Sequence, residues 1–354
     1  MLNMSSQDTR RKVRLNEKVE SRVRGDLYAR FGGEYLETYY CKKWQGAGCL
    51  AYEQYKNHWS DFRSWAQLSH AEDWLLFPGN VGPFLSIDET DAGDLRTIIT
   101  NKQAHGRKGS IVAIVKGTRA EDVSSVLLKL PRRLRYRVQE ITLDMAPSME
   151  KIARECFPAA RLVTDRFHVH QLVHEAVQDL RVQHRWEAIE SENEAILHAR
   201  ENGLKFKPAM LENGDTLKQL LARSRYLLYK TPSWWTPSQE TRAGILFKLY
   251  PDIKQAYELA LKLGQIFRRT RWKDVAYTKL AQWYRKVEET KLKAFATVAR
   301  TIENHYQTIL NYFDNRSTNA AAESFNAKIK EFRRVFRGIR DIKFFLFRLC
   351  KIYA

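Results

Sequence analysis

Short β-rich apolar runs between residues 84 and 165 constrain the fold of this chain more than any other feature of its 354 residues. Polar or glycine-containing turns divide the first three runs, a pattern that predicts a three-strand meander. Apolar residues at helical spacing over 120–130 predict a helix that Pro131 ends, and 148–156 predicts a shorter second helix. The five predicted strands occupy residues 84–88, 95–100, 110–115, 138–144 and 161–165.

This order of elements is that of the ribonuclease-H-like fold: three strands, a helix, a strand, a helix and a fifth strand. In that fold the first and fourth strands are neighbours. Asp88 and Asp144 end those two runs and are therefore expected to lie close together. The predicted fold class is α/β, with a ribonuclease-H-like mixed five-stranded sheet and flanking helices.

Helical patterns replace strand patterns after residue 169, which predicts that a large all-helical insertion interrupts the core. Within it, Thr236 and Gln239 have the residue types of an N-cap and its capping-box partner. Ser69 and Glu72 predict a similar helix start before the first strand. The predicted segments are a basic arm (1–30), a helical lead-in (31–82), the first part of the core (83–169), the insertion (170–315) and the final helices (316–354).

The charge of the chain favours a polyanionic partner. Its 60 Lys and Arg residues against 41 Asp and Glu give a net charge of +19 at pH 7. Basic groups gain free energy by displacing counterions from phosphates. A basic surface that serves only solubility is the alternative, but cations cluster in the N-terminal arm, at Arg10, Arg11, Lys12 and Arg14.

The four cysteines form no CxxC pair, which argues against a zinc ribbon and a disulfide framework. No apolar run reaches the length of a transmembrane helix, and the basic N-terminus lacks the apolar segment of a signal peptide. We therefore expect free thiols and a soluble, cytoplasmic protein.

Three acidic residues are the candidate catalytic groups: Asp88, Asp144 and Glu323. The first two end predicted strands, and Glu323 lies on a predicted helix among lysines and arginines. Carboxylates fixed by packing are the hard oxygen ligands that Mg²⁺ takes in phosphoryl transfer. On spacing alone, two turn aspartates and a solvated glutamate are an equally good interpretation.

The helix that carries Glu323 is predicted to have two distinct faces. Phe325, Ile329, Phe332 and Phe336 recur at helical spacing, and we expect them to pack on the sheet. A second stripe beside Glu323 is suited to binding the phosphates of DNA. It comprises Asn326, Lys330, Arg333 and Arg337. A solvated basic stripe is the alternative interpretation.

Asp165 is a rival for the second metal-binding acid, because it ends the fifth predicted strand three residues before His168. The strand order favours Asp144, since the fourth strand neighbours the first. Asp165 and His168 are then expected to hydrogen-bond one another and to orient the site.

Two further pairs have both a functional and an ordinary interpretation. His170 and His174 are one helical turn apart and could bind zinc, although surface histidines at such spacing are far more common. Trp234 and Trp235 could stack on an extruded DNA base, or they could plug the core of the insertion.

Three stretches resemble the DDE transposases of bacterial insertion sequences, in their ISL-type branch. They are LSIDET, ITLDMAPSMEKIARECFPAARLVTDRFHV and NRSTNAAAESFNAKIKEFRRVFRGIRDIKFFLFRL. The resemblance implies cutting and joining of element ends by a ribonuclease-H-like core. It also implies two Mg²⁺ ions, replaceable by Mn²⁺, on Asp88, Asp144 and Glu323. DNA ends and target DNA are the implied partners of a nucleoid-associated homodimer or higher oligomer.

The N-terminal region departs from the pattern of this family. Family members commonly begin with zinc-binding and helix-turn-helix modules that recognise the terminal repeats. Here only about eighty residues precede the first predicted strand, and they show no zinc-ligand spacing. A separate end-recognition polypeptide, or truncation of the chain, would account for this departure.

The predicted function is that of a DNA transposase acting by two-metal phosphoryl transfer. Two alternatives stay open: a catalytically inactive DNA-binding remnant, and a metal-dependent nuclease of the same fold that cuts without joining. The presence of Asp88, Asp144 and Glu323 counts against the remnant.

Overall fold

The computed structural model describes residues 52–91, 94–335 and 341–354, and the chain divides into two compact units. The first unit comprises Met1–Arg161 and Asn319–Ala354, and the second comprises Leu162–Thr318. The first unit is therefore built from two segments that are far apart in sequence.

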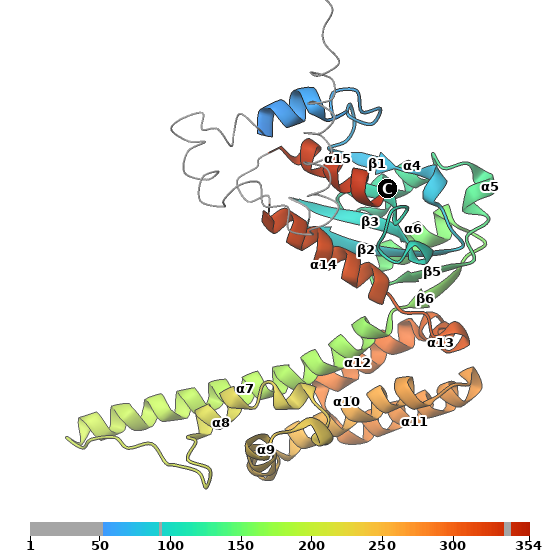
Figure 1. Cartoon of the computed structure of the whole chain (residues 1–354). Coiled ribbons are helices and arrows are strands. Elements are labelled where there is room, and N and C mark those ends of the chain that lie inside the picture. The colour runs from blue at the N-terminus through green and yellow to red at the C-terminus, as the bar shows by residue number, and fades with distance from the viewer. Residues whose placement is uncertain (1–51, 92–93, 336–340) are drawn as a thin grey trace, which may run out of the picture. The chain divides into compact units, whose positions relative to one another are not determined.

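A six-stranded mixed sheet is the centre of this α/β architecture (Figure 1). The strand order across the sheet is β1-β4-β3-β2-β5-β6. β2 runs antiparallel to β3 and parallel to β5, which confirms the predicted pairing of the first and fourth runs. The strands are β1 (Trp74–Leu76), β2 (Phe84–Asp91), β3 (Leu95–Asn101), β4 (Ile111–Lys116), β5 (Glu140–Leu143) and β6 (Arg161–Thr164).

The edge strand β1 shows that the predicted count of five strands was wrong. Residues 66–73 form turns, not the helix predicted from Ser69 and Glu72, and β1 pairs antiparallel with β4. The Gln67 side chain donates to the carbonyl oxygen of Leu76 at 3.1 Å and accepts from its N–H at 2.8 Å. Leu75 is fully buried, so this segment gains more from sheet pairing than from a short isolated helix.

Helices from both segments of the first unit pack against the sheet. Phe325 and Ile329 of α14 (Ala320–Val335) join Ile98 and Ile114 of the sheet in one buried cluster, which also includes several residues of α15 (Ile342–Tyr353). The predicted apolar face is thus confirmed for Phe325, Ile329 and the partly buried Phe332, while Phe336 lies outside the described residues. The remaining α-helices of this unit are α4 (Ala120–Leu127), α5 (Arg132–Arg135) and α6 (Pro147–Cys156).

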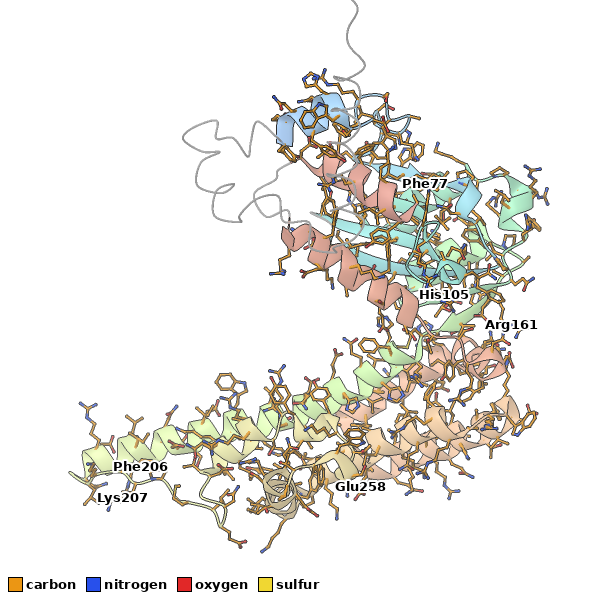
Figure 2. The ribbon with its side chains drawn as sticks, viewed as in Figure 1. Phe77, His105, Arg161, Phe206, Lys207 and Glu258 are labelled. Atoms are coloured by element: carbon orange, nitrogen blue, oxygen red, sulfur yellow. The ribbon has the colours of Figure 1, made fainter. Side chains whose placement is uncertain are left out.

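After β6 the second unit is built from helices, with no further strand among its residues. Thr236 and Gln239 form the predicted capping box at the start of α9. In Figure 2, Phe206 and Lys207 lie near the last turns of α7. The α-helices are α7 (Arg166–Glu201), α8 (Leu217–Arg223), α9 (Pro237–Leu249), α10 (Pro251–Arg269), α11 (Lys273–Thr290), α12 (Lys293–Asn304) and α13 (Tyr306–Asn315).

The core of the second unit is aromatic. Trp283 is fully buried and donates its indole N–H to the carbonyl oxygen of Leu259 at 3.0 Å, so its polar atom is satisfied inside the core. Phe267 contacts the rings of Tyr312 and Phe313. Within the described part of the chain, no helix combines the length and apolarity needed to cross a bilayer.

Candidate active site

Asp88 and Asp144 occupy matching positions on neighbouring parallel strands. Ser86 is paired with Thr142 in the register of β2 and β5. Asp88 lies two residues after Ser86 and is still within β2. Asp144 lies two residues after Thr142, directly after the end of β5. Side chains two residues apart share one face of a sheet, and adjacent strands lie about 4.8 Å apart. The two carboxylates therefore project from the same face at the same level.

Hydrogen bonds from the protein hold each of these carboxylates. Asp88 accepts from the backbone N–H of Glu89 at 2.8 Å through Oδ1. Its Oδ2 accepts from Nδ2 of Asn326 at 2.6 Å. Asp144 accepts from the backbone N–H of Ala146 at 2.8 Å, which fixes the turn that leads into α6. Both aspartates are half-buried, so they are anchored but can still be reached from outside.

The pKa of Glu89 indicates that negative charge gathers where β2 and β5 end. Burial raises the pKa of the Glu89 carboxyl above its ordinary value, and the charges of Asp144 and Asp88 raise it further. We did not identify Glu89 from the sequence, where its only signal is its position next to Asp88 on the strand.

Glu323 lies in the first turn of α14 and is half-buried. Its backbone N–H donates to the carbonyl oxygen of Asn319 at 2.9 Å. Asn326, one helical turn further along, contacts Asp88. Residues three apart lie on the same helix face, so Glu323 shares its face with the residue that contacts the first aspartate.

A second contact fixes the direction of α14 along β2. Arg333 pairs with Asp91 at the end of that strand, with 2.5 Å between Nη1 and Oδ1. Together with the bond between Asn326 and Asp88, this places two points of the helix against the same strand.

The available donors suit a hard cation such as Mg²⁺, although they do not form a closed cage. Asp88, Asp144 and Glu323 would supply carboxylate oxygens, and no sulfur or imidazole lies among these donors. The carbonyl oxygen of Asn326 is a further oxygen here, buried and without a hydrogen-bond partner. Among the described residues, no three His, Cys, Asp or Glu side chains converge as ligands of one ion. The three-carboxylate metal site therefore stays a prediction.

The predicted DNA-binding stripe of α14 has members in different environments. Asn326 is only 8% exposed and bonds to Asp88. Lys330 and Arg333 are exposed, and Arg333 is paired with Asp91. Arg337 lies outside the described residues, as do the arm residues Arg10, Arg11, Lys12 and Arg14. Phosphate contact by the stripe and the arm stays a prediction.

Asp165 is the N-cap residue of α7, in the second unit. It is 1% exposed, and its Oδ1 accepts from the backbone N–H of Phe167 at 3.4 Å. His168 is half-buried, with its ring edge-on to Phe167. The predicted bond between Asp165 and His168, and any role for them in orienting the site, stay predictions.

His170 and His174 are half-buried on α7 and have lowered pKa values. Burial, helped by His174 and by Arg166 and Arg268, lowers the pKa of His170 to about 4. Burial also lowers the pKa of His174. One ring nitrogen of each imidazole is buried, so these side chains are half-buried rather than exposed as expected. The described residues add no third ligand that would make a zinc site.

The two neighbouring tryptophans differ in their surroundings. Trp234 is 76% exposed. Trp235 donates its indole N–H to the carbonyl oxygen of Leu227 at 2.9 Å and stacks on Tyr257. Trp235 therefore has the contacts of a core residue, whereas Trp234 is accessible to a ligand.

Comparison with known proteins gives one match, to a family model described as "Transposase", of the ISL-type DDE group. The match covers residues 85–349 and so includes Asp88, Asp144, Glu323 and Asn326. No curated protein and no solved structure matches the chain.

Proposed function

The chain belongs to the ISL-type DDE transposase family, and from this membership we propose that it cuts and joins insertion-sequence ends by metal-dependent phosphoryl transfer. One observation carries the proposal: Asp88 and Asp144 stand level on adjacent parallel strands beside the helix that bears Glu323. A ribonuclease-H-like core is part of the proposal. The strand order β4-β3-β2-β5-β6 supports it, because it brings the first and fourth predicted strands together.

In this mechanism the chain's own residues hold and orient the reacting groups. Asp88, Asp144 and Glu323 would hold magnesium, which when bound stabilises charge on the attacking and leaving oxygens. The hydrogen bonds from Glu89 and Asn326 fix the Asp88 carboxylate in advance, so less reorganisation is needed during the reaction. Lys330, exposed on the same helix, would contact the phosphates of the scissile strand.

Strand cleavage and joining of a labelled element end test this function directly. We expect both activities in Mg²⁺ or Mn²⁺ and neither in a chelator. Cleavage without joining to target DNA would favour the nuclease alternative. DNA binding without cleavage in either metal would favour an inactive remnant.

A further inference from the structure

Asn326 contacts the candidate catalytic carboxylate directly. Its side chain projects from α14, and its Nδ2 donates to Oδ2 of Asp88 at 2.6 Å. The residue is only 8% exposed, which leaves its amide little access to a phosphate on the protein surface. Its neighbours Phe325 and Ile329 are anchored in the core, so the helix backbone that presents the amide is fixed by packing.

The bond to Asp88 determines which way the Asn326 amide points. An ionised carboxylate can only accept hydrogen bonds, so the NH₂ group and not the carbonyl must face it. The amide oxygen is bonded to the same carbon as the donating nitrogen, so it lies close to the Asp88 carboxylate without being its hydrogen-bond partner. It is buried and has no hydrogen-bond partner. Buried polar atoms are nearly always satisfied, so an orphaned acceptor beside an active-site carboxylate indicates a ligand.

We propose that Asn326 is a positioning residue for Asp88 and that its amide oxygen is an additional ligand for the divalent cation bound there. This inference rests on the proposed function. The NH₂ group occupies one lone pair of Asp88 Oδ2 and restricts rotation of the carboxylate. The amide oxygen is a hard donor of the kind that Mg²⁺ and Mn²⁺ accept.

A neutral ligand suits this location better than another acid. Asp88 and Asp144 already place two carboxyl groups level on neighbouring strands. A further carboxylate would add repulsion whenever the cation is absent. An amide supplies the oxygen without the charge, and it also supplies the N–H donor that an acid lacks.

Mn²⁺ binding by the full chain, measured calorimetrically without DNA, tests the inference independently of catalysis. We expect Asn326→Ala to weaken Mn²⁺ binding about 10- to 100-fold, the range for groups that orient metal ligands. Asn80→Ala is a matched control, because it removes an amide-to-carbonyl bond of 2.7 Å to Ile111 in the same unit. The control should bind Mn²⁺ as the wild type does.

Asn326→Asp separates a role in metal binding from a role in packing, because the two side chains have nearly the same shape. In a chelator the new carboxylate should repel Asp88 and lower the melting temperature. Added Mn²⁺ should then raise the melting temperature more than it does for the wild type. An amide that lies away from the cation would predict the same Mn²⁺-induced rise in both proteins. If Asn326→Ala does not fold, the comparison of Asn326→Asp with the wild type tests the inference alone.

Two results would overturn the inference. One leaves the proposed function intact, and the other contradicts it as well. In the first, Asn326→Ala binds Mn²⁺ with an affinity within twofold of the wild type, while Asp88→Asn binds it more weakly. That result would exclude Asn326 from the metal site and leave Asp88 in it. Absence of Mn²⁺ binding by the wild type would contradict the metal-dependent function as well.

Discussion

Asp88 lies near the end of one strand and Asp165 directly follows another, but they are held in different ways. Asp88 accepts bonds from its neighbour on the strand and from a distant helix. Asp165 accepts from the first turn of the helix that it caps. The bond from Asn326 therefore ties Asp88 to α14, whereas the bond from Phe167 serves the start of α7.

We predict that Asp88→Asn, Asp144→Asn or Glu323→Gln each reduces cleavage of a labelled element end to background. Each change removes a charge that is proposed to hold the metal and keeps the side-chain shape, so DNA binding should stay within a few-fold of the wild type. Gel-based cleavage and fluorescence anisotropy on the same preparations measure the two properties.

Asp165→Asn is the matched control for these variants. Asparagine caps helices about as well as aspartate and can still hydrogen-bond to His168, so this variant should fold and keep most of its cleavage activity. The opposite pattern, with cleavage retained in Asp144→Asn and lost in Asp165→Asn, would show that Asp165 is the second catalytic acid.

A second prediction at this scale concerns pH and His170. Its folded pKa of about 4 lies below the unfolded value near 6.5, so the unfolded chain binds more protons between these values. The stability contributed by the neutral imidazole is complete above pH 6.5 and is lost as pH falls towards 4. Between pH 7 and pH 5 the loss should be about 2 kcal/mol.

Urea unfolding at pH 7 and pH 5 checks this value. His170→Gln should show a loss smaller by about 2 kcal/mol, whatever its stability at pH 7. His198→Gln, at an exposed position of the same helix, should keep the wild-type dependence. Equal pH dependence in His170→Gln and the wild type would show that His170 does not resist protonation.

Helix α14 combines core packing and site chemistry in one element. Phe325 and Ile329 are buried against the sheet, while Asn326 and Arg333 contact the residues of β2. The apolar face was predictable, because its period is intrinsic to the helix. The contact of Asn326 was not, since a polar residue next to that face can point to solvent or to a neighbour. The position of α14 along β2 determines which of these two directions the side chain takes.

The strands show the same difference between features that the local sequence predicts and features that depend on distant residues. The runs that became β2 to β6 were recognisable, and their order was sufficient to predict that β2 and β5 are neighbours. β1 has only three residues, too few to show a period of two, and it pairs with β4 about forty residues later. Glu89 was missed for a related reason, because its pKa depends on Asp144 from another strand.

We predict different effects on stability for the two tryptophans that precede α9. Trp235→Ala should lower the free energy of unfolding by about 3 kcal/mol, because its ring packs on Tyr257 and its N–H is bonded. Trp234→Ala should change stability by less than about 0.5 kcal/mol, since its ring is exposed. If Trp234 stacks on a displaced base, its loss should slow end processing.

An abasic nucleotide near the cleavage site should partly restore the rate of Trp234→Ala, because less unstacking is then required. Chemical denaturation and single-turnover cleavage measure the two effects. A large loss of stability in Trp234→Ala without rescue by the abasic substrate would rule out base stacking.

For the molecule as a whole, the net charge of +19 predicts strongly salt-dependent DNA binding. Each duplex phosphate contact contributes about −0.9 to the slope of log affinity against log salt. Replacing Arg10, Arg11, Lys12 and Arg14 with Ala should make the slope shallower by up to about 3.6, if each contacts one phosphate.

A control with the same change of net charge separates phosphate contact from total charge. Lys151, Arg154, Lys254 and Arg285 are cations in surface ion pairs with glutamates, and their replacement should change the slope less. An unchanged slope in the arm variant would exclude the arm as a DNA contact.

The division of the first unit between Met1–Arg161 and Asn319–Ala354 has a consequence for how the protein is made. At about 5–20 residues per second, a ribosome needs on the order of ten seconds to synthesise the intervening unit. Throughout that time the sheet residues Ile98 and Ile114 lack the helices that later bury them. A nascent chain that stops before Asn319 also lacks Glu323 and Asn326, so it carries an uncovered apolar face and lacks two residues of the proposed site.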